Sequence, residues 1–216
     1  MTPIPLGIVG SARSSAGYLA KCVELGALTV QDGFNDALTE SAYPKAGTVV
    51  SVGTDPYGHE ALLSANNSCL KGSIVRESTP YTLVGATSLV DGASSDFCRL
   101  VIFDAGFLGR QAARSSTSVA RHTFAADAGT WHWFAFTVDT AIPDETTTVY
   151  RDGVPYGSPI TRGDATQSVG TKAFEFGGIS TMADRAIGHF SACAIFDSAL
   201  SPQEIADLYA AYQGGL

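Results

Sequence analysis

The chain has 216 residues, of which 45% are hydrophobic and 16% are charged, a balance typical of a folded protein with an ample core. Its 13 basic and 21 acidic residues give a net charge of −8, which argues against nonspecific binding of nucleic acid, because such binding needs cationic side chains against the phosphates. No stretch offers the roughly 18 consecutive apolar residues of a membrane helix, so we expect no membrane insertion.

Residues 1–16 are expected to form an extended N-terminal arm, because Pro3 and Pro5 exclude a regular helix and limit pairing within a sheet. Such an arm packs along a domain edge or reaches a neighbouring subunit, so we expect a homo-oligomer. The opening apolar run lacks a preceding positive charge, and prolines and glycines interrupt it, so no signal peptide is expected. Residues 17–216 are expected to form a single domain.

The rest of the chain is expected to form many short strands that turn signals separate. One strand is predicted within residues 21–30, and others are predicted at residues 47–53, 81–90, 97–104, 117–124, 131–138, 173–177 and 186–196, with two more between 59 and 75 around Asn66-Asn67. Gly106 and Gly109 are assigned to the turn after 97–104. Many short strands with one terminal helix indicate a β-sandwich.

The stretch from Trp131 to Gly153 predicts a hairpin around which the fold is organised. Apolar residues fall on both faces of its first strand, with Trp131, Trp133 and Ala135 on one face and Phe134, Phe136 and Val138 on the other. A strand that is apolar on both faces needs cover on both sides, so we expect it in the centre of a layered β structure. A second strand ends at Val149-Tyr150, and Asp152-Gly153 marks the next turn.

The C-terminus changes to a helical period. Ser201 is the expected N-cap, Pro202 occupies the first helical position, and Glu204 completes a capping box. An apolar stripe follows at positions i, i+3, i+4 and i+7, formed by Ile205, Leu208, Tyr209 and Tyr212. This pattern predicts an amphipathic helix of about three turns that docks on the β body.

The cysteines are far apart, with no CxxC pair and no neighbouring histidine, so the sequence does not support a zinc site. One or two disulfides remain compatible with the spacing, but buried free thiols are the preferred interpretation. The four residues concerned are Cys22, Cys69, Cys98 and Cys193.

The order of motifs in the second half of the chain resembles the laminin-G-like branch of the concanavalin-A-like lectin/glucanase superfamily, over about residues 60–212. The motifs are Gly129-Thr130-Trp131-His132, Ala135-Phe136-Thr137-Val138-Asp139, Val149-Tyr150-Arg151-Asp152-Gly153, Phe176-Gly177-Gly178, Gly188-His189-Phe190, Ala194-Ile195-Phe196 and the segment from Ala199 to Ile205. The resemblance implies an all-β jelly-roll β-sandwich of two antiparallel sheets with one short C-terminal helix. The chain departs from the family at Trp133, where a second histidine is usual.

The family's glucanases use carboxylates that alternate along one strand in an E-x-D-x-x-E pattern. No Glu of this chain is followed two positions later by Asp, so glycoside hydrolysis is the least favoured function. Spacing alone does not exclude Ser-His-Asp catalysis, but no serine lies in a local nucleophile elbow. His132 stands between tryptophans and is interpreted as a half-buried packing residue. We therefore expect no catalytic residues and no enzyme activity.

Calcium is the one cofactor with a candidate site, because Asp139, Asp144, Glu145 and Asp152 would meet if the two ends of the hairpin converged. The alternative is that Asp139 ends a strand, Asp144 and Glu145 lie in a solvated loop, and Asp152 makes the turn. On that preferred interpretation the protein needs no metal.

Two groups of residues are candidates for ligand binding. If residues 107–124 form a hairpin, Arg110, Arg114 and Arg121, with His122, would share a face that meets an acidic partner or a glycan, although a solvated outer face is the simpler interpretation. Tyrosines near turns would stack against sugars or pack against the core; they are Tyr57, Tyr81 and Tyr156.

These observations favour a non-enzymatic structural and adhesion protein. The opening MTPIPLGIVGSA also resembles the starts of some phage structural proteins. We therefore expect a phage virion surface component (decoration, fibre or tail-associated), assembled in the host cytoplasm, whose partners are other virion or surface structural proteins and host glycan. The alternative is a carbohydrate-binding module of a secreted or cell-surface protein, which would be extracellular.

Overall fold

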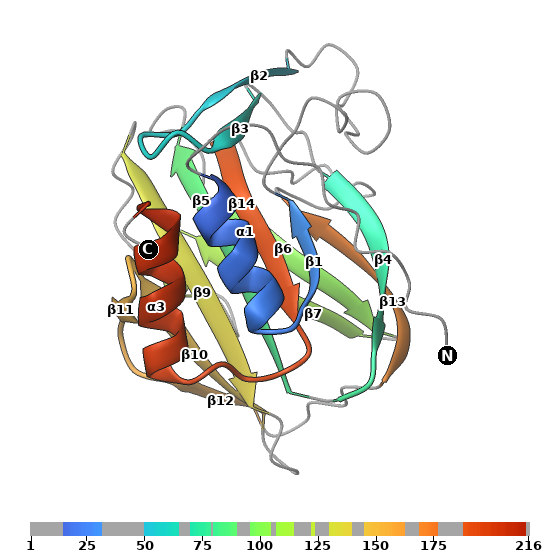
Figure 1. Cartoon of the computed structure of the whole chain (residues 1–216). Coiled ribbons are helices and arrows are strands. Elements are labelled where there is room, and N and C mark those ends of the chain that lie inside the picture. The colour runs from blue at the N-terminus through green and yellow to red at the C-terminus, as the bar shows by residue number, and fades with distance from the viewer. Residues whose placement is uncertain are drawn as a thin grey trace.

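The computed structural model describes residues 15–31, 50–64, 70–78, 80–89, 96–104, 107–114, 122–123, 130–139, 145–162, 169–176 and 188–214. Its elements are α1 (Ser15–Glu24), β1 (Ala27–Gln31), β2 (Val50–Thr54), β3 (Glu60–Ser64), β4 (Leu70–Arg76), β5 (Tyr81–Leu89), β6 (Asp96–Asp104), β7 (Phe107–Arg114), β8 (His122–Thr123), β9 (Trp131–Asp139), β10 (Glu145–Arg151), β11 (Val154–Pro155), β12 (Ile160–Arg162), β13 (Gly170–Phe176), β14 (Gly188–Phe196) and α3 (Pro202–Tyr212). Figure 1 shows the whole chain in this order.

The strands form two sheets, which confirms the predicted β-sandwich. The large sheet has nine strands in the order β11-β10-β9-β5-β14-β3-β2, with β1 beside β14 and β12 beside β10. The small sheet has five strands in the order β4-β13-β6-β7-β8. The described strand pairs are antiparallel, apart from β7 with β8, which run parallel.

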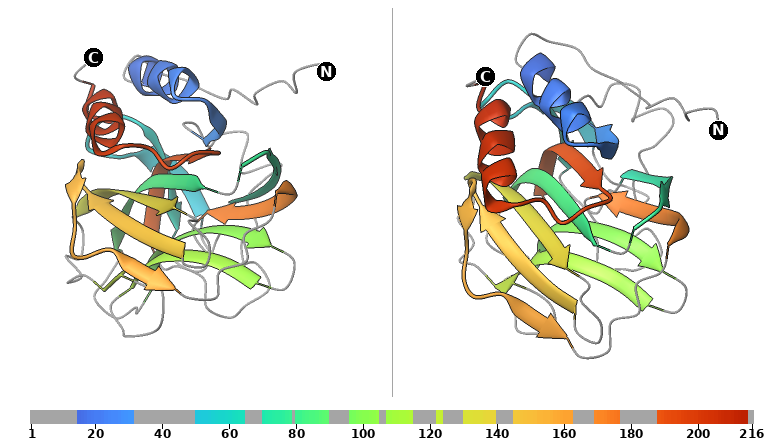
Figure 2. Two further views of the ribbon diagram at one scale, coloured as in Figure 1. Left: turned by 90° about the horizontal axis from the view of Figure 1, so that it is seen from below. Right: turned by 60° about the horizontal axis from the view of Figure 1, so that its bottom comes forward.

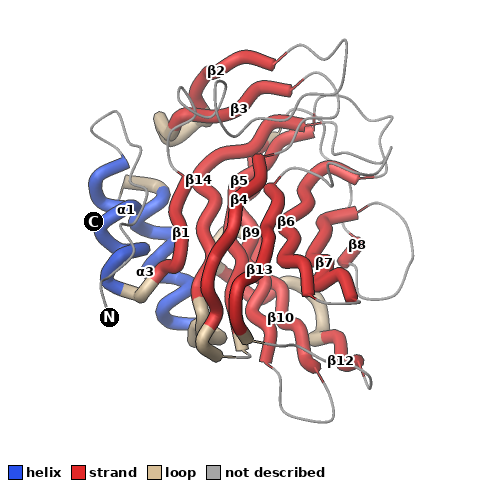
Figure 3. The backbone as a smooth tube through the Cα atoms, turned by 90° about the vertical axis from the view of Figure 1, so that its right-hand side faces the viewer, coloured by secondary structure: helices blue, strands red, loops and turns tan. Residues whose placement is uncertain are grey.

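Two helices add a third layer. Both lie on the outer face of the large sheet, and the small sheet lies on the other side (Figure 2, left, and Figure 3). The helices bury a hydrophobic core against β5, β9, β10 and β14. The residues of this core are Tyr18, Cys22, Ala27, Val30, Val84, Ala86, Trp133, Ala135, Tyr150, Ala192, Ala194, Phe196, Leu200, Ile205, Leu208 and Tyr212. The two helices therefore cover the central strands of this face.

The central position predicted for residues 131–138 is confirmed. In the structure β9 lies between β5 and β10, and every residue from Trp133 to Val138 is buried. Trp133 and Ala135 belong to the core under the helices, while Phe134 and Phe136 occupy the opposite face and stack with ring centroids 6.3 Å apart. The two-sided apolar pattern therefore reflects cover by helices on one side and by a second sheet on the other.

The C-terminal helix begins as predicted. The Ser201 side chain accepts a hydrogen bond from the Glu204 backbone N–H at 3.3 Å, and the Glu204 carboxylate accepts one from the Ser201 backbone N–H at 2.7 Å. This is the reciprocal capping box that the sequence indicates. The residues of α3 that are buried are Ile205, Leu208, Ala211 and Tyr212.

Helix α1 corrects the predicted extent of the N-terminal arm. The strand expected within residues 21–30 is present as β1, which begins at Ala27, and the first part of that range belongs to α1. The helix buries Tyr18 and Cys22, four positions apart, while Gly26 at φ +77° makes the turn into β1. Ser15 and Ala16, the end of the predicted arm, form the start of α1, and residues 1–14 lie outside the described residues.

The predicted hairpin over residues 107–124 is also corrected. Phe107–Arg114 forms β7, so Gly109 lies inside a strand and not in a turn. Because β8 pairs with β7 in parallel, through Ala113 with His122, the two strands are not neighbours in a hairpin.

A buried ion pair ties the small sheet to the connection before α3. Arg76 at the end of β4 is 1% exposed, and its Nε lies 3.3 Å from the Asp197 carboxylate. The Arg76 guanidinium also donates to the carbonyls of Ser78 and Pro80 and lies over the Tyr81 ring, 4.6 Å from its centroid. Removing one partner of such a pair costs about 3–5 kcal/mol, because the other charge stays buried.

Candidate functional site

Two polar clusters flank the C-terminal end of α3, and they differ in exposure. The first surrounds Asp55, which opens the turn between β2 and β3 and is 5% exposed. One carboxylate oxygen accepts the backbone N–H groups of Tyr57 at 2.9 Å and His59 at 3.0 Å. The other accepts the hydroxyls of Ser191 at 2.8 Å and Tyr212 at 2.6 Å. Asp55 therefore joins the turn, β14 and α3 at one buried point.

His59 completes this buried cluster. Its Nε2 lies 2.6 Å from the Tyr212 carbonyl oxygen, so it donates a hydrogen bond to the end of α3. Its ring stacks on the Tyr212 ring at 4.7 Å and meets the edge of Tyr18 at 5.5 Å. Burial and the neighbouring Asp55 charge raise the pKa of the Tyr212 hydroxyl, which stays protonated as a donor.

The Asp55 cluster contains a serine, a histidine and an aspartate, but not in a catalytic arrangement. The Ser191 hydroxyl donates to Asp55 and not to the His59 ring, whose Nε2 is bonded to a backbone carbonyl. A nucleophile needs a base within hydrogen-bond reach and access to a substrate. Ser191 and His59 are both 0% exposed, so we assign this cluster a structural role.

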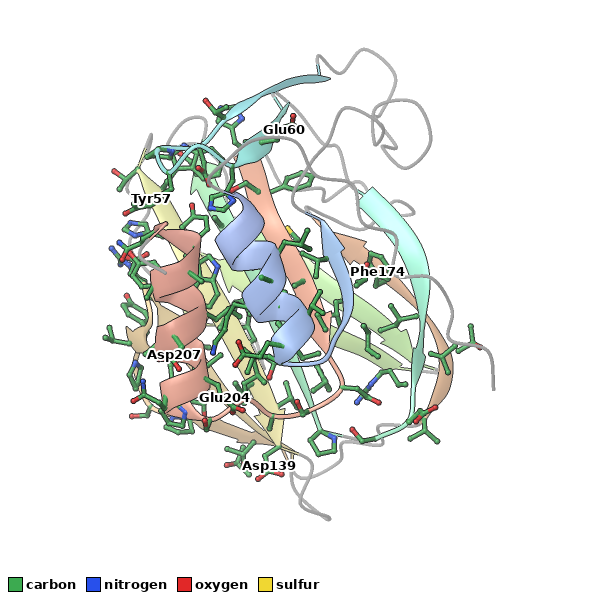
Figure 4. The ribbon with its side chains drawn as sticks, viewed as in Figure 1. Tyr57, Glu60, Asp139, Phe174, Glu204 and Asp207 are labelled. Atoms are coloured by element: carbon green, nitrogen blue, oxygen red, sulfur yellow. The ribbon has the colours of Figure 1, made fainter. Side chains whose placement is uncertain are left out.

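The second cluster is half-exposed and consists of two groups. The phenol–amide group comprises Tyr57, Tyr209 and Gln213. The Gln213 amide donates to the Tyr57 hydroxyl at 3.3 Å and to the Tyr209 hydroxyl at 3.0 Å. Figure 4 shows Tyr57 beside the C-terminal end of α3, and its side chain is 37% exposed. Burial and the hydrogen bond with Tyr57 raise the pKa of Tyr209, so its phenol stays neutral.

The hairpin-end group comprises His132, Arg151, Asp152 and Tyr156. One Asp152 carboxylate oxygen accepts the Trp133 backbone N–H at 3.0 Å, and the other lies 2.8 Å from His132 Nδ1. Arg151 Nη2 lies 3.0 Å from His132 Nε2, and its guanidinium lies over the Tyr156 ring, 5.5 Å from the centroid.

His132 contacts both charged side chains of this group. Its Nδ1 lies 2.8 Å from the Asp152 carboxylate and 3.2 Å from Arg151 Nε, and its Nε2 lies 3.0 Å from Arg151 Nη2. The imidazole therefore holds Asp152 and Arg151 at the edge of the sheet.

Gly153 brings the two groups together. Asp152 and Gly153 form a two-residue turn with φ of +52° and +79°, the left-handed turn that the Asp-Gly pair predicts. A Cβ on Gly153 would lie 2.7 Å from Tyr209 Cδ1, so only glycine allows the turn to pack this closely on α3. We call the combined surface the α3-edge patch; its residues are Tyr57, His132, Arg151, Asp152, Tyr156, Tyr209 and Gln213.

The three tyrosines predicted as ligand contacts have different positions. Tyr57 and Tyr156 both lie in the α3-edge patch. Tyr81 is 0% exposed and packs under the Arg76 guanidinium, so the prediction that it stacks against a sugar is wrong. It begins a central strand, where the side chain points into the sandwich.

The predicted arginine surface is described only in its backbone. Arg110 pairs with Val101 and Arg114 with Asp96 on the neighbouring strand β6, and His122 lies on β8. The side chains of these residues, and all of Arg121, lie outside what the structure describes. The arginine surface therefore stays a prediction.

The calcium site predicted at the hairpin is corrected in one respect. Asp139 pairs with Thr146, and Asp152 follows Arg151, which pairs with Phe134, so the two aspartates lie at opposite ends of the hairpin. Six strand positions separate them by roughly 20 Å, too far to share an ion. Figure 4 shows Asp139 at the far end of the molecule from Tyr57. Asp144 lies outside the described residues, as does the Glu145 side chain.

Within the described residues, no group of three or more His, Cys, Asp or Glu side chains is placed to hold a metal ion. The described part of the chain also contains no helix long and apolar enough to cross a membrane. The thiols of Cys22 and Cys193 are buried and form no disulfide, as predicted, whereas Cys69 and the Cys98 side chain lie outside the described residues.

Sequence reasoning missed the contribution of α3 to the patch. Tyr209 was assigned to the apolar stripe, Gln213 to no role, and His132 to packing alone. The hydrogen bond from His132 to Asp152 joins residues 20 positions apart, and the one from Gln213 to Tyr57 joins residues 156 apart. The sequence offered one indication of the contact between His132 and Asp152, because both residues belong to the motifs that carry the family resemblance.

No curated protein matches the chain in sequence. Among solved structures, the receptor binding domain of botulinum neurotoxin D is similar with a TM-score of 0.53 at 11% identity, covering 87% of this chain and 53% of that one. The receptor binding domain of the botulinum neurotoxin C/D mosaic serotype has a TM-score of 0.52 at 11% identity, with 85% and 51% covered. The chain thus spans about half the length of these structures, and at this identity they show the fold alone.

A family model adds sequence evidence for this fold. The model described as "Concanavalin A-like lectin/glucanases superfamily" matches residues 80–206, which is more than half of the chain. The matched region runs from β5 into α3 and includes the hairpin of β9 and β10. The protein therefore belongs to this laminin-G-like family of the concanavalin A-like lectin/glucanase superfamily.

Proposed function

We propose that the protein is a non-enzymatic structural and adhesion protein that binds a partner through the α3-edge patch. One observation carries the proposal: three separate elements converge to present half-exposed rings beside hydrogen-bonding groups. Tyr57 comes from the β2–β3 turn, Tyr156 and Asp152 from the end of the β hairpin, and Gln213 from the end of α3. Half-exposed tyrosines with adjacent polar groups are typical of binding surfaces.

The absence of catalysis is part of the proposal. Ser191 and His59 are buried and bonded to structural partners, and Glu204 caps α3. The sequence also lacks the paired carboxylates that retaining glycosidases use. A glycoside hydrolase is accordingly the least favoured function, and we propose that binding requires neither metal nor cofactor.

We further propose that the protein is a surface component of a phage virion, assembled in the host cytoplasm as a homo-oligomer with other virion proteins. The opening residues, which resemble phage structural proteins, support this, and the two neurotoxin structures are named as receptor binding domains. The alternative is an extracellular carbohydrate-binding module. A disulfide between two of the four cysteines would favour this alternative, because secreted domains favour disulfides.

Light scattering on the full chain and on a chain lacking residues 1–14 tests the assembly proposal. The truncation removes residues 1–14 of the predicted arm and spares α1, which begins at Ser15. We expect a defined oligomer, found in purified particles, that becomes monomeric on truncation. A protein that is monomeric in both forms and missing from particles would overturn the virion proposal. Hydrolysis of a polysaccharide by the full chain would overturn the non-enzymatic one.

A further inference from the structure

The α3-edge patch complements a segment of the protein's own chain, the residues that precede α1. We propose that residues 1–14 of one copy dock on the α3-edge patch of a second copy. This inference rests on the proposed function, because it names the partner that the patch binds and the contact that joins the copies of the oligomer.

The segment leaves the described structure beside the patch. The described part of the chain starts at Ser15, and Tyr18 lies one helical turn later on α1. The Tyr18 ring meets the edge of the Tyr212 ring at 6.0 Å, and Tyr212 meets Tyr57 at 5.0 Å. Three rings in contact therefore connect the start of α1 with the patch, and Figure 1 shows the start of α1 beside the end of α3.

The apolar side chains of the segment fit the exposed rings of the patch. The segment contains the run Pro3-Ile4-Pro5-Leu6. Proline fixes φ and favours an extended polyproline-II course, whose apolar side chains pack on aromatic surfaces. The patch offers Tyr57, which is 37% exposed, and the half-buried Tyr156, next to Val154, which is 61% exposed. Docking of this run would remove apolar surface of both copies from water.

The backbone of the segment suits the hydrogen-bonding groups of the patch. A polyproline-II segment makes no internal hydrogen bonds, and Pro3 and Pro5 have no N–H, so this run presents mainly carbonyl acceptors. The Tyr57 hydroxyl accepts from the Gln213 amide at 3.3 Å, so its own hydrogen points away from Gln213 and can be donated to such a carbonyl.

The turn that carries Tyr57 is already fixed. Asp55 accepts the Tyr57 backbone N–H at 2.9 Å, and the Gln213 amide also donates to Tyr209 at 3.0 Å. Because these side chains are ordered before binding, they lose little rotamer freedom when the segment docks.

Charge favours the approach of the segment to a second copy. Arg13 is the one charged side chain in residues 1–14, whereas the chain as a whole has a net charge of −8. A segment with one positive charge and no negative charge is attracted to the acidic body of another copy.

The length of the segment favours a neighbouring copy over the same copy. Pro5 precedes Ser15 by ten residues, which span about 31 Å in a polyproline-II conformation. The start of α1 adjoins its own patch, so an extended segment passes this patch and reaches the patch of a neighbour. Each copy then gives one segment and receives one, a heterologous contact that yields a defined oligomer when the ring of copies closes.

The test is a complementation experiment with two variants of the full chain, followed by light scattering. The segment variant combines Pro3→Ala with Pro5→Ala and keeps the patch, while the patch variant is Tyr57→Ala and keeps the segment. Gln203→Ala is the matched control, because it changes an exposed side chain at the other end of α3, where Gln203 bonds Asp207. Thermal melting establishes that each variant is folded.

We expect each variant alone to assemble roughly tenfold more weakly than the wild type, the usual effect of truncating an anchor residue of an interface. An equimolar mixture should form a complex of two chains, because the intact segment of one variant meets the intact patch of the other. Gln213→Ala should weaken assembly by about threefold, and Gln203→Ala should assemble like the wild type.

The segment variant keeps the inference testable if Tyr57→Ala fails to fold, because its changes lie outside the described body of the protein. A labelled peptide of residues 1–14 should then bind the segment variant, and the peptide with both prolines replaced by alanine should bind it roughly tenfold more weakly.

Two results would overturn docking on the patch and leave the assembly proposal intact: variants that keep the wild-type oligomer, or a mixture of weakened variants that forms no complex. A monomeric wild type would overturn docking in a second copy together with the assembly proposal. An oligomer that depends on both the segment and the patch but is missing from particles would support the docking and overturn the virion proposal alone.

Discussion

Asp55 and Asp152 lie on two sides of the C-terminal end of α3, and each holds a turn in place by accepting backbone N–H groups. Asp55 is 5% exposed and accepts four donors from three elements. The Asp152 side chain is 34% exposed and has two partners from β9 plus the nearby Arg151. The same chemical group is therefore enclosed by the protein at one site and open to solvent at the other, and burial makes the difference.

The sharpest test of this comparison replaces each aspartate with alanine. Asp55→Ala removes the acceptor of three buried donors and one part-buried donor, so we expect a loss of about 3–5 kcal/mol in the free energy of unfolding. Asp152→Ala exposes its former partners to water and should cost about 1 kcal/mol. Urea unfolding of both variants measures the difference. Equal losses would show that the two carboxylates are equally structural.

The next largest effect is expected at Gly153, which joins the exposed patch to α3. Gly153→Ala should cost about 2–3 kcal/mol, because the new Cβ meets Tyr209 and the residue has a positive φ. Gly26→Ala is the matched control, with a similar φ of +77° and no heavy atom within 4 Å of the added Cβ, and should cost about 1–2 kcal/mol. If both variants lose the same free energy of unfolding in denaturant titration, the Tyr209 side chain moves away from the added Cβ without a loss of stability.

A smaller loss is expected at the start of α3. Ser201→Ala removes one half of the capping box and should cost about 1 kcal/mol at neutral pH. The Ser201 hydrogen bonds lower the pKa of Glu204 below 4.5, so the carboxylate's contribution is present above pH 4.5 and is lost as the pH falls through the lowered pKa. The gap in melting temperature between wild type and variant should therefore narrow in acid. A constant gap would mean that the Ser201 hydroxyl does not contribute to lowering the pKa of Glu204.

The smallest expected effect concerns His189, which stacks on Trp131 with ring centroids 6.2 Å apart. Burial lowers its pKa below 6.5, so the unfolded chain takes up the proton at higher pH than the folded protein does. Its contribution to stability is therefore full above pH 6.5 and is lost as the pH falls below that value. His189→Gln should flatten the stability profile between pH 5 and 7. An unchanged profile would show that His189 can be charged in place without cost.

The sequence predicted features that depend on neighbouring residues. The capping box at Ser201, the Asp152-Gly153 turn and the strand at 131–139 are all present, because caps, turns and strand alternation act over a few positions. Helix α1 was missed because the local pattern around it is ambiguous. Its two fully buried side chains, Tyr18 and Cys22, follow a stretch interrupted by prolines, and the short apolar pattern did not separate a helix from a strand.

The candidate site was predictable only in fragments. Tyr57, Tyr81 and Tyr156 were all chosen because they lie near turns, and Tyr81 is buried. Proximity to a turn does not decide which way a side chain points, and that direction depends on strand register and on what covers the face. The partners Gln213 and Tyr209 lie on α3, more than 150 residues after Tyr57, so their role required the folded chain.

By itself, the sequence determined the β-sandwich, its central strand, the C-terminal helix and the family, because these follow from periodicity, turn residues and ordered motifs. Only the tertiary structure decided that α1 joins α3 over one face of the large sheet, that Asp55 is buried and that Asp152 is open to solvent. Exposure is the outcome of packing between distant segments, since the groups that bury Asp55 come from β14 and α3, 136 and 157 residues further along the chain.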